Sequence, residues 1–163
     1  MIHKIKVLSD EGKIQNKIIE EYEKLINYNF PLEYKELLSE HNGLYLINSA
    51  FDYYDEVIQK NEGNFIYFYF FKENNKYELG DSSSSMVYFL MDNEDFQKGI
   101  VPFAGTPNGD FICFDYRDDL KSDNPKIVLV HHDADDENGN LIISFLGNNF
   151  EEFMDSLYEY TDA

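Results

Sequence analysis

The segment between residues 100 and 146 most constrains the fold, because short apolar runs there alternate with clusters of turn-forming residues. The stretch "IVPFAGTPNGDFICFDYR" has two apolar runs interrupted by Gly, Pro and Asn, which favours a strand, a tight turn and a second strand. The runs "KIVLVHH" and "NLIISFL" flank "DADDENG" and indicate the arms of a hairpin. The earlier run "NFIYFYFF", dense in aromatic residues, predicts another strand. The main predicted strands are 65–71, 111–116, 126–132 and 140–146.

Helical spacing appears on both sides of this strand block. Apolar residues recur at helical intervals from Ile14 to Ile26, with charged residues between them. The next segment, "FPLEYKELLSEHNG", has Pro31 where a first helical residue tolerates it and Asn42-Gly43 where a helix should stop. "NNFEEFMDSLYEY" places its apolar residues on one helical face. The predicted helices are 14–28, 31–41 and 149–160, with a short one in "MVYFLMDNEDF" capped by the serines at 82–85, and "GLYLINS" as a possible strand.

These elements predict an α+β fold. Helices at both ends enclose a block of strands, so we expect a mixed, mostly antiparallel sheet with helices packed around it. The 163 residues are a comfortable size for one domain, and we predict a single domain over 1–163. A hydrophobic fraction of 43% supplies enough apolar mass for a core.

The charge of the chain limits its partners. The 32 acidic and 13 basic residues give a net charge of −19. Nucleic acids and anionic membranes are therefore disfavoured, because both are bound through clustered Lys and Arg. One interpretation is a general defence against aggregation, and the other is a negative field that attracts a basic protein.

The sequence favours a cytoplasmic location. Its first residues, "MIHKIKVLSDEGK", lack the apolar run of a secretory signal, and no segment reaches membrane-spanning length. A single cysteine, Cys113, allows no internal disulfide, which agrees with a reducing compartment.

The stretch "HHDADDENGN" is the most suggestive of a metal site, but its spacing argues against one. A calcium loop needs glycine at its sixth position and glutamate at its twelfth, and no register provides both. Adjacent His131 and His132 should point to opposite faces of a strand, so they would not converge on one ion. We therefore expect a solvated acidic hairpin loop and no metal site.

Other catalytic patterns are equally weak. Cys113 lies in the apolar run "FICF", which is typical of a buried cysteine rather than a nucleophile. The turn "GTPNGD" lacks the Lys-Ser/Thr pair of a phosphate loop. With so many acidic residues, pairs of carboxylates carry little information about acid–base catalysis. We predict no catalytic residues and no cofactor.

Three motifs, in order over roughly residues 15–160, resemble the SUKH superfamily (Smi/Knr-type). The first is a Pro-entered helix that ends at Asn-Gly, the second is an apolar strand with a Gly turn and a second strand ending in Asp, and the third is a closing hairpin with a Phe-x-x-Phe helix. The matching residues are Phe30-Pro31, Glu33-Tyr34-Lys35, Asn42-Gly43, Pro102, Gly109, Asp110, Asp115, Phe150 and Phe153.

The resemblance implies a non-enzymatic immunity protein that binds and neutralises a toxin, often a nuclease, or alternatively a regulatory or scaffold interaction module. The charge fits the first role, because an acidic inhibitor can occupy a basic cleft. An enzyme would instead need a pocket with convergent polar groups. We expect "DYRDD" and "DADDENG" to share one acidic face that meets a basic toxin. The candidate contact residues are Asp115, Asp118, Asp119, Asp133, Asp135, Asp136 and Glu137.

Overall fold

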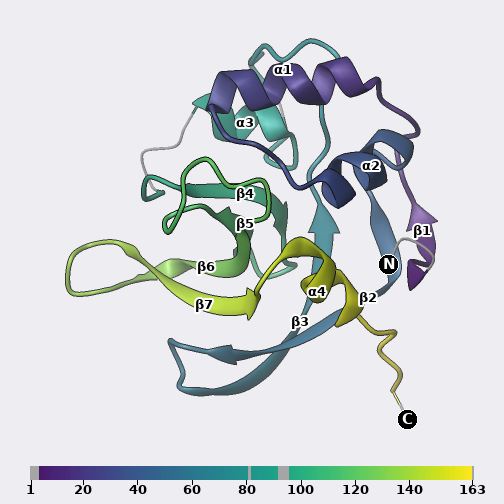
Figure 1. The fold of residues 1–163 in the computed structure, drawn as a ribbon. Coiled ribbons are helices and arrows are strands. Elements are labelled where there is room, and N and C mark those ends of the chain that lie inside the picture. The colour runs from purple at the N-terminus through teal and green to yellow at the C-terminus, as the bar shows by residue number, and fades with distance from the viewer. Residues whose placement is uncertain (1–3, 81, 92–95, 163) are drawn as a thin grey trace.

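The computed structural model, which describes residues 4–80, 82–91 and 96–162, contains one seven-stranded sheet (Figure 1). Each strand lies beside its neighbour in sequence, in the order β1 to β7, and all six described pairs are antiparallel. The predicted α+β fold with a mostly antiparallel sheet is confirmed. The strands are β1 (Val7–Ser9), β2 (Tyr45–Asp55), β3 (Lys60–Phe68), β4 (Ile100–Gly105), β5 (Phe111–Asp115), β6 (Lys126–Asp135) and β7 (Leu141–Gly147).

The helices also follow the predicted order. They are α1 (Asn16–Ile26), α2 (Leu32–Glu40), α3 (Met86–Met91) and α4 (Phe150–Asp155). Helix α1 ends because Asn27 adopts the left-handed conformation, with φ 62°. Helix α4 begins at Asn149, whose side chain accepts the Glu152 N–H at 2.8 Å. None of the described helices is both long and apolar enough to cross a membrane.

Several predicted boundaries are wrong, because tertiary pairing overrides local preference. The helix expected over 149–160 ends at Asp155, after which the chain extends and Tyr158 forms a β-bridge with Ala50. Strand β3 ends at Phe68 instead of residue 71, and the following Phe70 bridges to Ser85. The short strand β1 was not expected, since all three of its residues are exposed and carry no alternation. Residues 92–95 of the predicted third helix lie outside the described residues.

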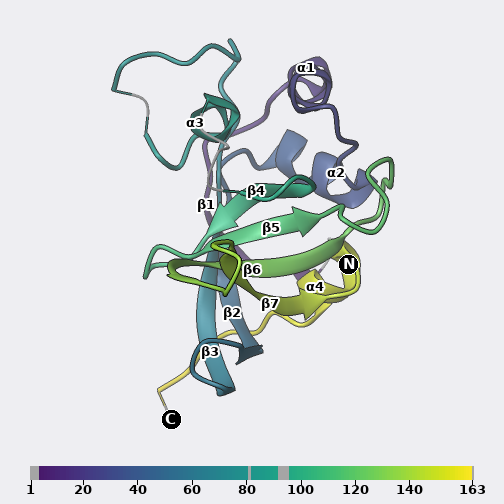
Figure 2. The same ribbon diagram turned by 90° about the vertical axis from the view of Figure 1, so that its left-hand side faces the viewer.

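The main core is a stack of aromatic rings between the sheet and the helices α1, α2 and α4. Phe103 of β4 and Phe114 of β5 stack at 4.1 Å between ring centroids, and Tyr34 of α2 meets both rings edge-on. A smaller cluster of Ile100, Cys113, Val128 and Val130 accompanies it. Ile112 and Phe114 of β5 belong to the main core, whereas Cys113 between them belongs to the smaller cluster. Strand β5 is therefore packed on both faces, which fixes the register of the strands that carry the acidic residues. Figure 2 shows α3 at the left end of β4, and α2 and α4 towards the right.

Candidate functional site

The two acidic segments singled out in the sequence lie at opposite ends of strand β6. Asp115 at the end of β5 pairs with Lys126, the first residue of β6, whereas Asp133 lies seven residues further along β6. At about 3.3 Å per residue, this separates the segments by roughly 20 Å. Figure 2 shows the loop between β5 and β6 on the right and the turn between β6 and β7 towards the left. Strand pairing therefore separates the two segments along β6, and their joint role as one acidic face stays a prediction.

At the first end lie Asp115, Asp118 and Asp119, which we call the paired segment because the first two have cationic partners. Asp115 accepts two hydrogen bonds from the Arg117 guanidinium, at 2.9 and 2.8 Å, and a third from the Arg117 backbone N–H at 3.0 Å. Asp118 forms an ion pair with Lys126 at 2.8 Å. Burial by itself would raise the pKa of Asp115, but the bonds from Arg117 outweigh it and hold the pKa below its ordinary value. Asp115 thus serves the local structure.

At the other end, Asp133, Asp135, Asp136 and Glu137 form what we call the acidic tip. Asp136 shapes the turn, since its Oδ1 accepts the backbone N–H groups of Asn138 at 2.8 Å and Asn140 at 3.0 Å. Within the described part of the chain, no Lys or Arg side chain lies within 4 Å of the four carboxylates. The acidic tip therefore presents uncompensated negative charge, and its role in binding stays a prediction.

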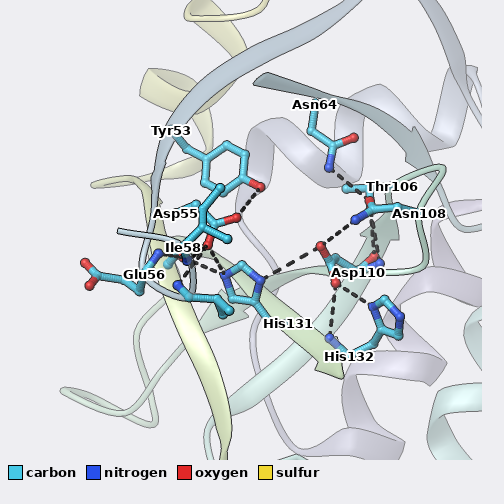
Figure 3. A network of polar contacts seen from close by, with 12 residues as sticks. Tyr53, Asp55, Glu56, Ile58, Asn64, Thr106, Asn108, Asp110, His131 and His132 are labelled. Atoms are coloured by element: carbon cyan, nitrogen blue, oxygen red, sulfur yellow. Dashed lines mark hydrogen bonds and ion pairs between the residues drawn. The ribbon is translucent and has the colours of Figure 1, made fainter. Parts of the chain in front are cut away.

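Beneath the acidic tip lies a buried polar network centred on His131 (Figure 3). The His131 ring is buried, and its Nε2 lies 2.7 Å from the hydroxyl of Ser144 on β7 and 3.8 Å from Asp55 on β2. Asp55 in turn accepts the backbone N–H groups of Val57 and Ile58, at 2.8 and 3.1 Å. Ser144 also accepts the Glu56 N–H at 3.0 Å. The network thus fixes the turn after β2 against the β6–β7 hairpin.

Asp110 is the second centre of the network. Its Oδ1 accepts the backbone N–H of His132 at 3.1 Å and lies 2.6 Å from the ring Nδ1, at hydrogen-bond distance. Its Oδ2 accepts the Asn108 amide at 3.1 Å and lies 4.0 Å from Nδ1 of His131. Gly109 adopts φ 93° and lets the turn bring Asn108 and Asp110 together. Figure 3 shows the two histidines on either side of the Asp110 carboxylate. The turn "GTPNGD" therefore has a structural role, because its Asp110 fixes the turn against His132 of β6.

His131 lies between Ser144 and Asp110, as the histidine of a catalytic triad lies between its serine and its aspartate. A substrate, however, has no access to these residues. Ser144 has no exposed surface and His131 is only 4% exposed. The Ser144 hydroxyl is held by the Glu56 N–H as well as by His131. A nucleophile must reach its substrate, and this one is covered by its own chain. These residues serve the stability of the hairpin.

Cys113 is equally unsuited to nucleophilic chemistry. It is fully buried in the smaller cluster, and this burial raises the pKa of its thiol well above the ordinary value. The thiolate is the reactive form, so the thiol stays inert in the folded protein.

One cluster offers three potential metal ligands. Ligand atoms of Asp110, His132 and Asp133 all lie within 4.8 Å of one another. However, Nδ1 of His132 and Oδ1 of Asp110 are 2.6 Å apart, whereas two ligands of a tetrahedral metal with bonds of about 2.1 Å are about 3.4 Å apart. The shared proton of a hydrogen bond explains this distance better than a shared ion. The expectation that folding needs no metal stays a prediction.

Sequence reasoning missed Asp55 and Ser144 as members of a polar network. No local signal could have revealed them, since Asp55 precedes His131 by 76 residues and meets it only through the sheet. Asp110 lay within the resembling motif, but its role as an acceptor for His132 depends on the pairing of β5 with β6.

The comparisons with known proteins place the chain in a family. No curated protein and no solved structure matches it. The sequence model of the SMI1/KNR4 family (SUKH-1) matches residues 13–156, which include the three motifs and most of the sheet. The suspected SUKH resemblance is therefore confirmed, and the chain belongs to the SMI1/KNR4 family (SUKH-1).

Proposed function

We propose that this protein is a non-enzymatic immunity protein, which binds a basic protein toxin and neutralises it in the cytoplasm. The observation that carries the proposal is the uncompensated charge of the acidic tip, in a chain with a net charge of −19. Family membership supports the same role, because SUKH proteins include immunity proteins of this kind. The covered Ser144 and the inert Cys113 fit a protein that acts by binding and needs no cofactor.

The electrostatics favour a toxin that itself binds a polyanion. A nuclease has a basic cleft because it must hold phosphates. Four carboxylates on a short turn repel one another in the free protein, and a basic cleft relieves this repulsion. Exposed charges act over about 8 Å at physiological salt, so the acidic tip should mainly accelerate association.

The test is coexpression with the product of the adjacent gene. We expect this product to be toxic alone, harmless beside the immunity protein, and recovered with it as a stoichiometric complex. A non-toxic neighbour that still forms a complex would favour the regulatory or scaffold module instead. Loss of toxicity without any complex would contradict neutralisation by binding.

A further inference from the structure

A second surface of the molecule is lined by aromatic rings from segments other than the acidic tip. Its rings come from β2, from β3 and from the segment that follows α4. We call it the aromatic face; it consists of Tyr45, Tyr54, Phe65, Tyr67, Tyr158 and Tyr160.

The pairing of β2 with β3 brings the first of these rings together. Tyr45 lies opposite Tyr67, and their rings stack nearly parallel, with centroids 5.9 Å apart and 9° between planes. Phe65 is two residues before Tyr67 and therefore faces the same side. Further along, Asp52 lies opposite Gly63 and Tyr54 opposite Asn61. The face thus continues along the β2–β3 hairpin, which extends beyond the body of the molecule (Figures 1 and 2).

The segment after α4 completes the face. Tyr158 and Ala50 exchange two backbone hydrogen bonds, at 3.0 and 2.9 Å, which dock this segment along β2. The Tyr158 hydroxyl donates to Asp52 at 2.7 Å, and the ring of Tyr160 meets that of Phe65 edge-on at 5.8 Å. The early end of α4 therefore has a consequence, since a longer helix would not bring Tyr160 onto the sheet.

The exposure of these rings is unusual for a domain with so large an aromatic core. Five of them, all except Tyr67, are 39–57% exposed. Residues on the other side of the same strand, such as Phe51 and Tyr53, are buried. Adjacent exposed rings are typical of interaction surfaces, because tyrosine supplies contact area with little loss of conformational entropy.

The charge of the residues around the rings favours one kind of binding partner. Asp52 lies among the rings and, within the described residues, has no Lys or Arg at ion-pair distance, whereas Glu159 is already paired with Lys6 at 3.1 Å. A second copy of the chain or a nucleic acid would bring further negative charge to this surface, so both are disfavoured. Guanidinium groups, in contrast, stack on aromatic rings and pair with carboxylates at the same time.

We propose that the aromatic face is the surface that binds the partner protein, through arginine side chains of that partner. The acidic tip then acts at longer range and accelerates the encounter. The identity of this partner as a toxin rests on the proposed function, but the chemistry of the face does not.

The test is an NMR titration of the full chain with octa-arginine, with octa-lysine as a probe of equal charge. We expect octa-arginine to bind about fivefold more tightly, because only guanidinium stacks well on the rings. Octa-arginine should shift backbone amides near Tyr45, Phe65 and Tyr160. Equal affinities, or shifts confined to 133–137, would overturn the proposal.

Substitutions in the aromatic face test whether the preference for octa-arginine depends on its rings. The triple variant Tyr45→Ser, Phe65→Ser, Tyr160→Ser should bind both peptides equally. Tyr160→Ser alone should lower the arginine preference about twofold, and it leaves the paired strands intact. Phe145→Ser is the matched control, since Phe145 is a 52% exposed ring on β7, and it should keep the preference. If Phe145→Ser abolishes the preference as fully as the triple variant, the face is not specific.

The same variants separate this inference from the proposed function. If octa-arginine binds the aromatic face but the adjacent gene product does not bind, the immunity role fails and the surface stands. If the gene product binds wild type and triple variant equally tightly, the surface fails and the immunity role stands.

Discussion

Two sets of carboxylates lie at the β6–β7 hairpin, one buried against His131 and one in the acidic tip, and their surroundings are opposite. Asp55 and Asp110 lie in the buried network, where N–H groups of the backbone and of side chains surround them. The acidic tip extends from the same hairpin with no described Lys or Arg within ion-pair distance. The difference shows that the number of acidic residues does not indicate a binding surface. Only the carboxylates without partners have charge left to offer another molecule.

The paired segment allows the same comparison between compensated and uncompensated carboxylates within this protein. Its composition resembles that of the acidic tip, but Arg117 and Lys126 compensate Asp115 and Asp118. We therefore expect the paired segment to behave like the buried network in stability experiments and to contribute little to association.

The largest effect is expected from Asp110→Ala. The substitution leaves the His132 N–H and the Asn108 amide without their acceptor, and we expect a loss of about 3 kcal/mol in the free energy of unfolding. Urea denaturation measures it. Asp133→Ala is the matched control on the acidic tip and should change this free energy by less than about 0.5 kcal/mol. Equal losses in both variants would remove the distinction between the two sets.

Asp115→Asn should have a smaller and pH-dependent effect. Because the folded pKa of Asp115 is lowered, its stabilisation is present above the ordinary carboxyl pKa of about 3.9 and is lost as pH falls through the folded value. We expect a loss of about 1 kcal/mol at pH 7. Unfolding measured from pH 7 to pH 2 should show wild type and variant converging in acid. A constant difference across this range would argue against a role for the charge.

Neutralising the acidic tip should leave stability almost unchanged. Replacing Asp133, Asp135 and Asp136 by Asn and Glu137 by Gln removes their mutual repulsion and keeps a side-chain oxygen at position 136 as acceptor for the two backbone N–H groups of the turn, so we expect a change below about 0.5 kcal/mol. Association with the partner should slow about tenfold and become less sensitive to salt. Stopped-flow mixing measures both.

The control for that variant must remove the same number of charges elsewhere. Glu20, Glu21, Glu36 and Glu151 are exposed and suit this purpose, whereas Glu23 does not, because it accepts the Phe30 N–H at 2.7 Å. If both quadruple variants slow association equally, net charge alone is responsible and the acidic tip has no special position.

The smallest effect is expected from chelation. Since Oδ1 of Asp110 and Nδ1 of His132 lie at hydrogen-bond distance and too close for two ligands of one metal ion, thermal melts with and without a chelator should overlay. A lower melting temperature with the chelator would show that Asp110, His132 and Asp133 hold an ion and join the network to the acidic tip.

The sequence by itself determined the kinds of element and their order. Periodicity and turn residues are local, so the helix from Asn16, the helix from Leu32 and the β6–β7 hairpin could be predicted from neighbouring residues. The same locality explains the errors, because the end of α4 and the start of β1 depend on pairing with β2. The acidic excess and the family motifs were also visible in the sequence.

Only the tertiary structure decided which carboxylates have partners and which rings form a surface. The register of β5 on β6 put the two acidic segments at opposite ends of one strand. Strand pairing carried Asp55 to His131, and the docking of Tyr158 on Ala50 carried Tyr160 to Phe65. The physical reason is that a sequence pattern reflects interactions between residues a few positions apart. Charge compensation and exposure depend instead on atoms that come close from anywhere in the chain.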